Sequence, residues 1–203
     1  MKLYITPGSA YARMARVVLI EKGLDRRVDV VAAQTRLADS PYYAVCPSGR
    51  VPYLVRDDGV GMEESAVICA FLDQVDGAPS LTVPVDVDRW EWLRLEASAR
   101  SLLDGLSVWL RETSRPQAEQ SPGVVQHETA RSERMLDVWE QQVAHPLMGG
   151  PLNMPQITLA CALGLEARMP RLLWRTGRSR LVRWYSAVAA RPSFVSTAPP
   201  ATR

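Results

Sequence analysis

The sequence predicts an α/β domain followed by an all-helical domain. Strand and helix signals alternate over residues 1–76, in the order βαβ and then ββα, which is typical of a mixed sheet with helices packed on it. Proline and glycine interrupt this pattern over residues 77–86, which indicates a linker. Residues 87–203 show only helical periodicity, so we expect a bundle of helices there.

The elements of the first domain follow from their residue types. A strand over 2–6 leads into a helix over 10–23, which ends at Gly23, the residue type preferred just after a helix. A second strand over 26–31 and a short irregular helix over 39–45 come next.

Two short strands and a helix complete this domain. The strands, over 52–56 and 59–62, flank an Asp-Asp-Gly turn that is typical of a hairpin. The helix over 64–75 is expected to bury one apolar face, made of Val67, Ile68, Phe71, Leu72 and Val75.

Four helices are expected in the second domain, over 86–113, 123–144, 154–168 and 178–190. The first has apolar residues at spacings of three and four, namely Trp90, Leu93, Ala97, Leu102, Leu106 and Trp109. In the second helix the apolar positions are Met135, Trp139 and Val143. The last few residues are expected to form a loose tail.

Composition argues against several classes of protein. The formal net charge is only +2, and the arginine-rich stretch 168–191 has the spacing of a solvent-exposed face, so no nucleic-acid partner is expected. The cysteines Cys46, Cys69 and Cys161 form no Cys-x-x-Cys pair, which argues against a metal site and favours a reducing, cytoplasmic setting. The chain shows no signal segment and no bilayer-length apolar stretch, so we expect a soluble protein without a membrane partner.

Four features in a fixed order suggest a family. "TPGSAYAR" places Ser9 at a helix start, "CPSGRVPYL" places a Val-Pro bond before a strand, "EES" stands at the next helix start, and a helical half follows. In this order they resemble a cytosolic glutathione S-transferase, which joins a thioredoxin-like domain to a helical domain. The resemblance is strongest to small bacterial members with a Ser-Pro-Tyr/Phe-x-Arg pattern, here residues 9–13 with Ala10 in place of the proline.

The resemblance implies a set of glutathione contacts. The Val51–Pro52 bond is expected to be cis, so that the Val51 backbone pairs with the cysteinyl backbone of glutathione. Ser65 would hold the γ-glutamyl carboxylate at the helix start, where it is also expected to be the N-cap, and Glu64 would take the ammonium group. Arg50 would meet the glycyl carboxylate, or would be a solvated surface arginine.

Ser9 is the expected catalytic residue. A free thiol has a pKa of about 8.5, and only the thiolate is nucleophilic, so a hydroxyl donor at the positive end of a helix favours the reactive form. Thr6 and Tyr11 remain alternatives for the contact with the sulfur. The resemblance also implies an electrophile pocket between the first helix and the long helix, with Tyr11, Leu106 and Trp109 as candidate walls.

The expected function is glutathione transfer to a small hydrophobic electrophile, with glutathione as co-substrate, no metal, and a role in detoxification. The alternatives are a glutathione-dependent peroxidase or thiol reductase, although reductases of this family usually carry cysteine at the Ser9 position, and a non-catalytic binding module. The family also implies an isologous homodimer, formed by the helix from Ser65 and the long helix from residue 86.

The start of the third predicted helix has an altered form of the family's capping box. Asn153 is expected to cap this helix and Gln156 to reach back to it from three residues further on, while Pro155 fits the first turn. This box concerns folding rather than catalysis.

Overall fold

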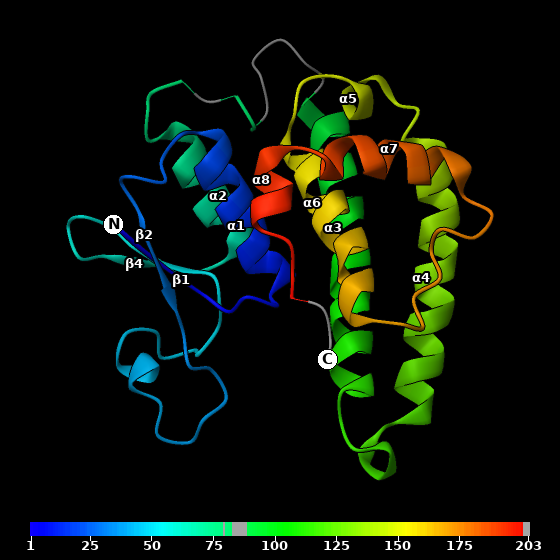
Figure 1. Ribbon diagram of the computed structural model, residues 1–203, viewed down its shortest axis with the longest axis horizontal. Helices are drawn as coiled ribbons and strands as arrows, with labels where there is room; N and C mark the ends of the chain where they lie inside the picture. The colour runs from blue at the N-terminus through cyan, green and yellow to red at the C-terminus, as the bar shows by residue number, and fades with distance from the viewer. Residues whose placement is uncertain (79, 83–88, 201–203) are drawn as a thin grey trace. The chain divides into compact units, whose positions relative to one another are not determined.

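The computed structural model describes residues 1–78, 80–82 and 89–200, and it divides the chain into two compact units (Figure 1). The first unit combines Met1–Thr82 with Pro192–Pro200, and the second spans Val83–Arg191. The predicted linker at 77–86 lies partly outside the described residues, as do the predicted start of the long helix and the last three residues of the predicted tail.

A four-stranded mixed sheet is the centre of the first unit. Its strands are β1 (Lys2–Ile5), β2 (Asp29–Ala32), β3 (Tyr53–Val55) and β4 (Gly61–Met62), in the spatial order β2-β1-β3-β4. β1 is parallel to β2 and antiparallel to β3, and β3 is antiparallel to β4. This is the βαβ-ββα sheet that the sequence predicts.

Two helices that pack against each other accompany this sheet, α1 (Ala10–Glu21) and α2 (Ser65–Gln74) (Figure 1). The short irregular helix or turn predicted at 39–45 is a 3-10 helix over Pro41–Ala44. The predicted apolar face of α2 is wrong in part, because Val67 is 50% exposed. The buried positions follow the helical repeat instead through Ser65, Ile68, Cys69, Leu72 and Asp73.

Asp73 is buried in spite of its charge because the segment after α2 folds back onto it. The backbone N–H groups of Ser80, Leu81 and Thr82 donate to its carboxylate, and Lys22 of α1 forms an ion pair with it at 3.4 Å. Burial alone raises the pKa of Asp73, but these hydrogen bonds outweigh burial and leave the pKa lowered. A sequence pattern of apolar residues cannot reveal a buried carboxylate of this kind.

The second unit is all-helical. Its main helices are α3 (Arg89–Thr113), α4 (Pro122–Gln142), α6 (Met154–Leu163) and α7 (Ser179–Ala189). α6 is buried at every position and packs against α3 and α7, while α3 also packs against α4 (Figure 1). The predicted helix at 123–144 is followed by a separate short helix, α5 (Pro146–Gly149), and the end of the helix predicted at 154–168 is a 3-10 turn over Gly164–Arg168.

The first half of the predicted stripe on α3 is wrong. Trp90 is 77% exposed, and Ala97 is also exposed. The buried face passes instead through Trp92, Leu95 and Ala99. It joins the predicted stripe from Leu102 onward and continues through Leu103, Leu106 and Trp109. Both stripes have helical spacing, so periodicity alone does not decide between them.

The capping box of α6 is confirmed in one half. The Asn153 side chain accepts from the Gln156 N–H at 3.0 Å, which makes it the N-cap. The Gln156 side chain does not return this bond, because its amide donates to the carbonyls of the preceding loop, Leu147 at 3.0 Å and Gly150 and Pro151 at 3.3 Å. The glutamine thus fastens the loop rather than the helix start.

The sequence does not predict the short helix that follows α7. This helix, α8 (Pro192–Ser196), packs against α1 of the first unit, whereas its stretch of sequence is predicted to belong to the helical domain. Ser193 and Phe194 are each 1% exposed, and Thr197 is fully buried. The first unit is therefore made of two stretches of chain that are distant in sequence.

Candidate functional site

Ser9 lies between β1 and α1, at the helix start where the sequence places it, and it is the N-cap of α1. Its backbone is extended, with φ −81° and ψ 118°, and its side-chain oxygen accepts from the Ala12 N–H at 3.2 Å. The Ser9 N–H donates in turn to the carbonyl of Thr6 at 3.1 Å. Two hydrogen bonds therefore fix this residue at the first turn of α1.

The capping bond leaves the Ser9 hydroxyl hydrogen available. The oxygen acts as an acceptor, and none of the residues that the structure describes accepts a hydrogen bond from the Ser9 O–H. A half-buried hydroxyl at a helix N-terminus, with its donor unused, can hydrogen-bond a bound anion. Thr6 and Tyr11 are also half-buried near the same helix start, and they stay alternatives.

The Val51–Pro52 peptide bond is cis, which confirms the sequence prediction. Within the described chain, no hydrogen bond joins the N–H or C=O of Val51 to another protein group. The loop before this bond is stabilised by the buried Tyr42, whose hydroxyl donates to the Arg50 carbonyl at 2.5 Å. This bond involves a residue that the sequence analysis did not single out.

Cys46 lies under the same loop and is fully buried. Its Sγ lies 3.3 Å from the hydroxyl oxygen of Ser48 and 3.7 Å from the Arg50 carbonyl oxygen. Burial, followed by its contact with Cys46, raises the pKa of Tyr42, so this phenol stays protonated and keeps its donor. Cys69 and Cys161 are also buried.

Glu64, rather than Ser65, is the N-cap of α2, which corrects the sequence prediction. Its Oε1 accepts from the Ala66 N–H at 3.3 Å and from the Ser65 hydroxyl at 3.2 Å. Glu64 has φ 70°, in the left-handed region that glycine favours, and this sharp turn brings Ser65 into the helix as its first residue. A strained backbone at an exposed polar residue is typical of a functional position.

The remaining predicted contacts differ in exposure. Ser65 is 3% exposed, while the side chains of Glu64 and Arg50 are exposed. Among the described residues, none forms a hydrogen bond or ion pair with the Arg50 guanidinium, while the backbone N–H of Arg50 donates to the Ser48 hydroxyl oxygen at 3.3 Å. Arg50 is therefore able to pair with an external carboxylate.

Sheet topology brings these segments to one end of the first unit. Because β1 is antiparallel to β3, the end of β1 that leads to Ser9 adjoins the end of β3 that follows Val51–Pro52. Because β4 is antiparallel to β3, the end of β4 that leads to Glu64 and Ser65 lies there too. The site thus combines a free hydroxyl donor, a free backbone donor and acceptor, and a helix start with an exposed carboxylate.

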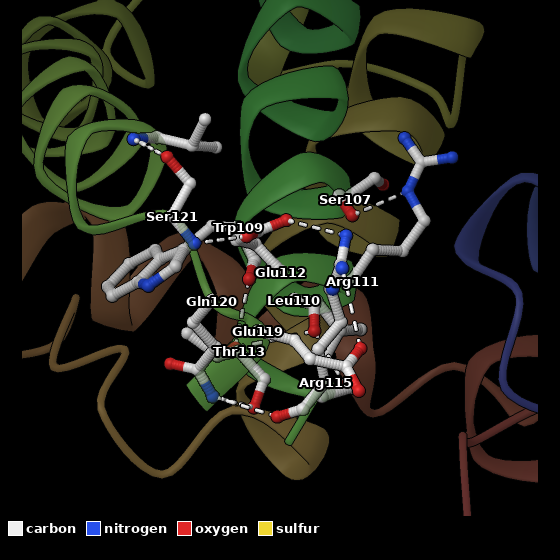
Figure 2. A network of polar contacts seen from close by, with 12 residues as sticks. Ser107, Trp109, Leu110, Arg111, Glu112, Thr113, Arg115, Glu119, Gln120 and Ser121 are labelled. Atoms are coloured by element: carbon white, nitrogen blue, oxygen red, sulfur yellow. Dashed lines mark hydrogen bonds and ion pairs between the residues drawn. The ribbon is translucent and has the colours of Figure 1, made fainter. Parts of the chain in front are cut away.

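The candidate electrophile residues belong to different units. Tyr11 is in the first turn of α1, whereas Leu106 and Trp109 are buried on α3, at 0% and 4% exposure. Figure 2 shows Trp109 near the end of α3, among the residues whose polar contacts join that end to the start of α4. A pocket formed by these three residues stays a prediction.

The contacts in Figure 2 define the turn between α3 and α4. The Glu112 carboxylate accepts from the Ser121 N–H at 2.5 Å, and the Gln120 side chain donates to the carbonyls of Thr113 and Arg115. The indole N–H of Trp109 is buried and has no hydrogen-bond partner among the residues that the structure describes. These bonds account for the helix turn, and none of them involves the end of the sheet that carries Ser9.

The other hollows and charged groups of the described chain are weaker candidates for a site. A surface hollow of about 520 Å³ lies at the opposite end of the sheet, where the charges of Met1 and Arg56 are paired with Asp57 and Asp58. Across the described ranges, no group of three or more His, Cys, Asp or Glu side chains is placed to hold a metal ion. None of the helices described is long and apolar enough to cross a bilayer.

The chain is similar to known proteins over nearly all of its length. The family described as "Glutathione S-transferase, N-terminal domain" matches residues 8–75, which include the segments from Ser9 to Ser65. An uncharacterized GST-like protein of Escherichia coli strain K12, YibF, is 29% identical over 202 residues, covering 98% of this chain and 99% of its own. Glutathione S-transferase 3 of Zea mays is 30% identical, covering 97% of this chain and 92% of its own.

A solved structure extends the likeness to the fold. The crystal structure of a glutathione transferase family member from Pseudomonas fluorescens Pf-5, with bound glutathione, superposes with a TM-score of 0.88 at 30% identity. The match covers 98% of each chain. By its sequence over nearly its whole length and by its fold, the chain belongs to the glutathione S-transferase family.

Proposed function

We propose that this protein is a glutathione transferase, which binds glutathione and stabilises its thiolate for attack on a small hydrophobic electrophile. The observation that carries the proposal is the unused O–H of Ser9 at the start of α1, at the end of the sheet that also carries the free Val51 backbone and Glu64. Support also comes from the Pseudomonas relative, whose structure holds glutathione.

Each residue of the site has a role that its geometry suits. Val51 offers its N–H and C=O to the cysteinyl backbone of glutathione, as an added strand would pair. Ser65 and the α2 start receive the γ-glutamyl carboxylate, and Glu64 receives the ammonium group. Arg50 pairs with the glycyl carboxylate.

Ser9 then acts on the sulfur. Its oxygen stays bonded to the Ala12 N–H while its O–H donates to the thiolate, so the thiol proton is lost to solvent more readily. The thiolate forms a bond to the electrophilic carbon and the leaving group departs with its electron pair. Ser9 does not become covalently modified, so the protein contributes binding, orientation and charge stabilisation.

The test has two parts. Calorimetric titration of the protein with glutathione should give a dissociation constant between about 1 µM and a few mM, and undetectable binding would leave only a non-catalytic module. Ser9→Ala should then lower kcat for conjugation of chlorodinitrobenzene by about tenfold to a hundredfold, with the glutathione dissociation constant almost unchanged. An unchanged kcat would exclude Ser9 as the thiolate donor.

The peroxidase and reductase alternatives are tested in the same preparation. Cumene hydroperoxide reduction and thiol–disulfide exchange should both be slower than conjugation. A reductase of this family would use a cysteine at the Ser9 position, and the three cysteines of this chain are buried elsewhere. A hydroperoxide rate above the conjugation rate would reassign the chemistry while keeping the same site.

We also propose a cytoplasmic homodimer with a role in detoxification. Large apolar side chains are exposed on α2, at Val67, and at the start of α3, at Trp90, the two helices expected to form the contact. Light scattering should give twice the chain mass, and Trp90→Glu should lower the proportion of dimer. A monomer at micromolar concentration would contradict the dimer but not the transferase.

A further inference from the structure

Arg13 is a buried cation whose partners lie almost at the other end of the sequence. Its side chain is 5% exposed, and among the described residues no carboxylate forms an ion pair with it. Its Nη2 donates to the carbonyl of Phe194 at 3.0 Å, and its Nε to the hydroxyl of Thr197 at 3.4 Å. The guanidinium also lies over the Phe194 ring, 5.4 Å from its centre.

The segment 192–197, here called the strap, is fastened to α1 at a second point. The hydroxyl of Ser193 donates to the carboxylate of Glu21 at 2.5 Å, at the last residue of α1. Arg13 and Glu21 are eight residues apart, or about 12 Å along the helix axis. The strap therefore holds α1 near both of its ends.

The Arg13 end of the strap is directly linked to Ser9. The Arg13 N–H donates to the Ser9 carbonyl at 2.9 Å, and the neighbouring Ala12 N–H donates to the Ser9 hydroxyl oxygen. A buried cation without a carboxylate depends on its hydrogen-bond acceptors, so the guanidinium and the strap fix each other in place. The first turn of α1, and with it Ser9, is thereby fixed as well.

We propose that the strap positions Ser9 for its contact with the glutathione sulfur, and that Arg13 is the positioning residue through which it acts. This inference rests on the proposed function, because it assigns a role in holding the thiolate donor. In this proposal, residues 194 and 197 influence the site at the end of the sheet without touching the bound tripeptide.

Two variants loosen the strap at the Ser9 end, and one provides a matched control. Arg13→Met removes both donors, and Thr197→Val removes the hydroxyl with little change of shape. Ser193→Ala removes one hydroxyl from the same strap at the Glu21 end. Arg13→Lys keeps the charge but cannot reach both acceptors in the geometry of a guanidinium, so it should have an intermediate effect.

We expect Arg13→Met to lower kcat by about tenfold and Thr197→Val by about threefold, with the KM for glutathione changed less than twofold. The thiolate fraction of bound glutathione, measured by ultraviolet absorbance across pH, should fall in both variants. Ser193→Ala should lower the Tm while leaving the thiolate fraction unchanged. If Arg13→Met does not fold, the thiolate fractions of Thr197→Val and Ser193→Ala still test the positioning role, because only the first should fall.

A double-mutant comparison separates this inference from the proposed function. In a Ser9→Ala background, Arg13→Met should cause no further loss of kcat, because Arg13 acts through Ser9. An equal loss in both backgrounds, or a lower Tm with an unchanged thiolate fraction, would overturn the positioning role. If Ser9→Ala itself leaves kcat unchanged, the proposed function fails first, and that outcome is recognised without any Arg13 variant.

Discussion

α1 and α2 of the first unit begin in opposite ways at the same end of the sheet. α1 begins at a serine with relaxed backbone angles, and the capping bond leaves its O–H unused. α2 begins at a glutamate with φ 70°, whose carboxylate folds back onto the helix start. A helix start can thus offer a ligand either a neutral donor or a negative charge, and only the second one requires a strained residue here.

The largest loss of activity is expected from a variant that keeps the N-cap at residue 9 but removes its O–H donor. Aspartate is as good an N-cap as serine, so Ser9→Asp should leave the free energy of unfolding within about 0.5 kcal/mol of the wild-type value. Its carboxylate has no proton to donate and repels a thiolate, so kcat for conjugation should fall more than about a hundredfold. Urea denaturation and conjugation kinetics measure the two quantities. Retained conjugation activity would mean that Ser9 serves only as a cap.

A variant of Asp73, near the end of α2, tests whether a carboxylate on this helix has a structural role as well. Asp73→Asn should lower the free energy of unfolding by about 2 kcal/mol at pH 7, because the buried carboxylate loses charge-assisted hydrogen bonds and its ion pair with Lys22. Urea denaturation measures this difference, and Asp76→Asn, at an exposed neighbour, is a matched control.

The same pair of variants predicts a pH dependence. The pKa of Asp73 is lowered in the folded state, so its contribution is complete above the unfolded-state pKa of about 3.9 and is lost as the pH falls through the lower folded-state value. The stability gap between wild type and Asp73→Asn should therefore be constant between about pH 5 and 7 and should close only at more acid pH. A gap that closes near neutrality would contradict this assignment.

The smallest expected effect concerns the strained start of α2. Glu64→Gly and Glu64→Ala both remove the carboxylate, so each should weaken glutathione binding by about tenfold. Only glycine accepts φ 70° without cost, so Glu64→Gly should be more stable than Glu64→Ala by about 1 kcal/mol. Calorimetry and urea denaturation of the two variants give both quantities. Equal stabilities would show that the backbone at residue 64 relaxes.

Local signals carried most of what the sequence predicts correctly. The helix start at Ser9 and the Asn153 cap each depend on residues within three positions, and the succession of strands and helices in the first unit follows from the turn signals between them. The cis conformation of the Val51–Pro52 bond was predictable only from the resemblance to a family, because the residue types alone do not determine it.

The incorrect or missing predictions depend on contacts distant in sequence. Trp90 and Trp92 fit the same helical repeat, and only packing against other helices decides that Trp92 is the buried one. Residue 64 is neither glycine nor asparagine, the types that most often adopt a positive φ, so its residue type does not predict this backbone angle. Arg13 belonged to the family pattern, but its pairing with Phe194 required the folded chain.

The docking of α8 onto α1 has a consequence for synthesis on the ribosome. About 110 residues separate Thr82 from Pro192, which at a translation rate of about 10 residues per second is a delay of about ten seconds. During that interval the nascent sheet and its two helices exist without the acceptors that Arg13 requires. The amino-terminal half is therefore made first but finished last, only after the helical half has emerged.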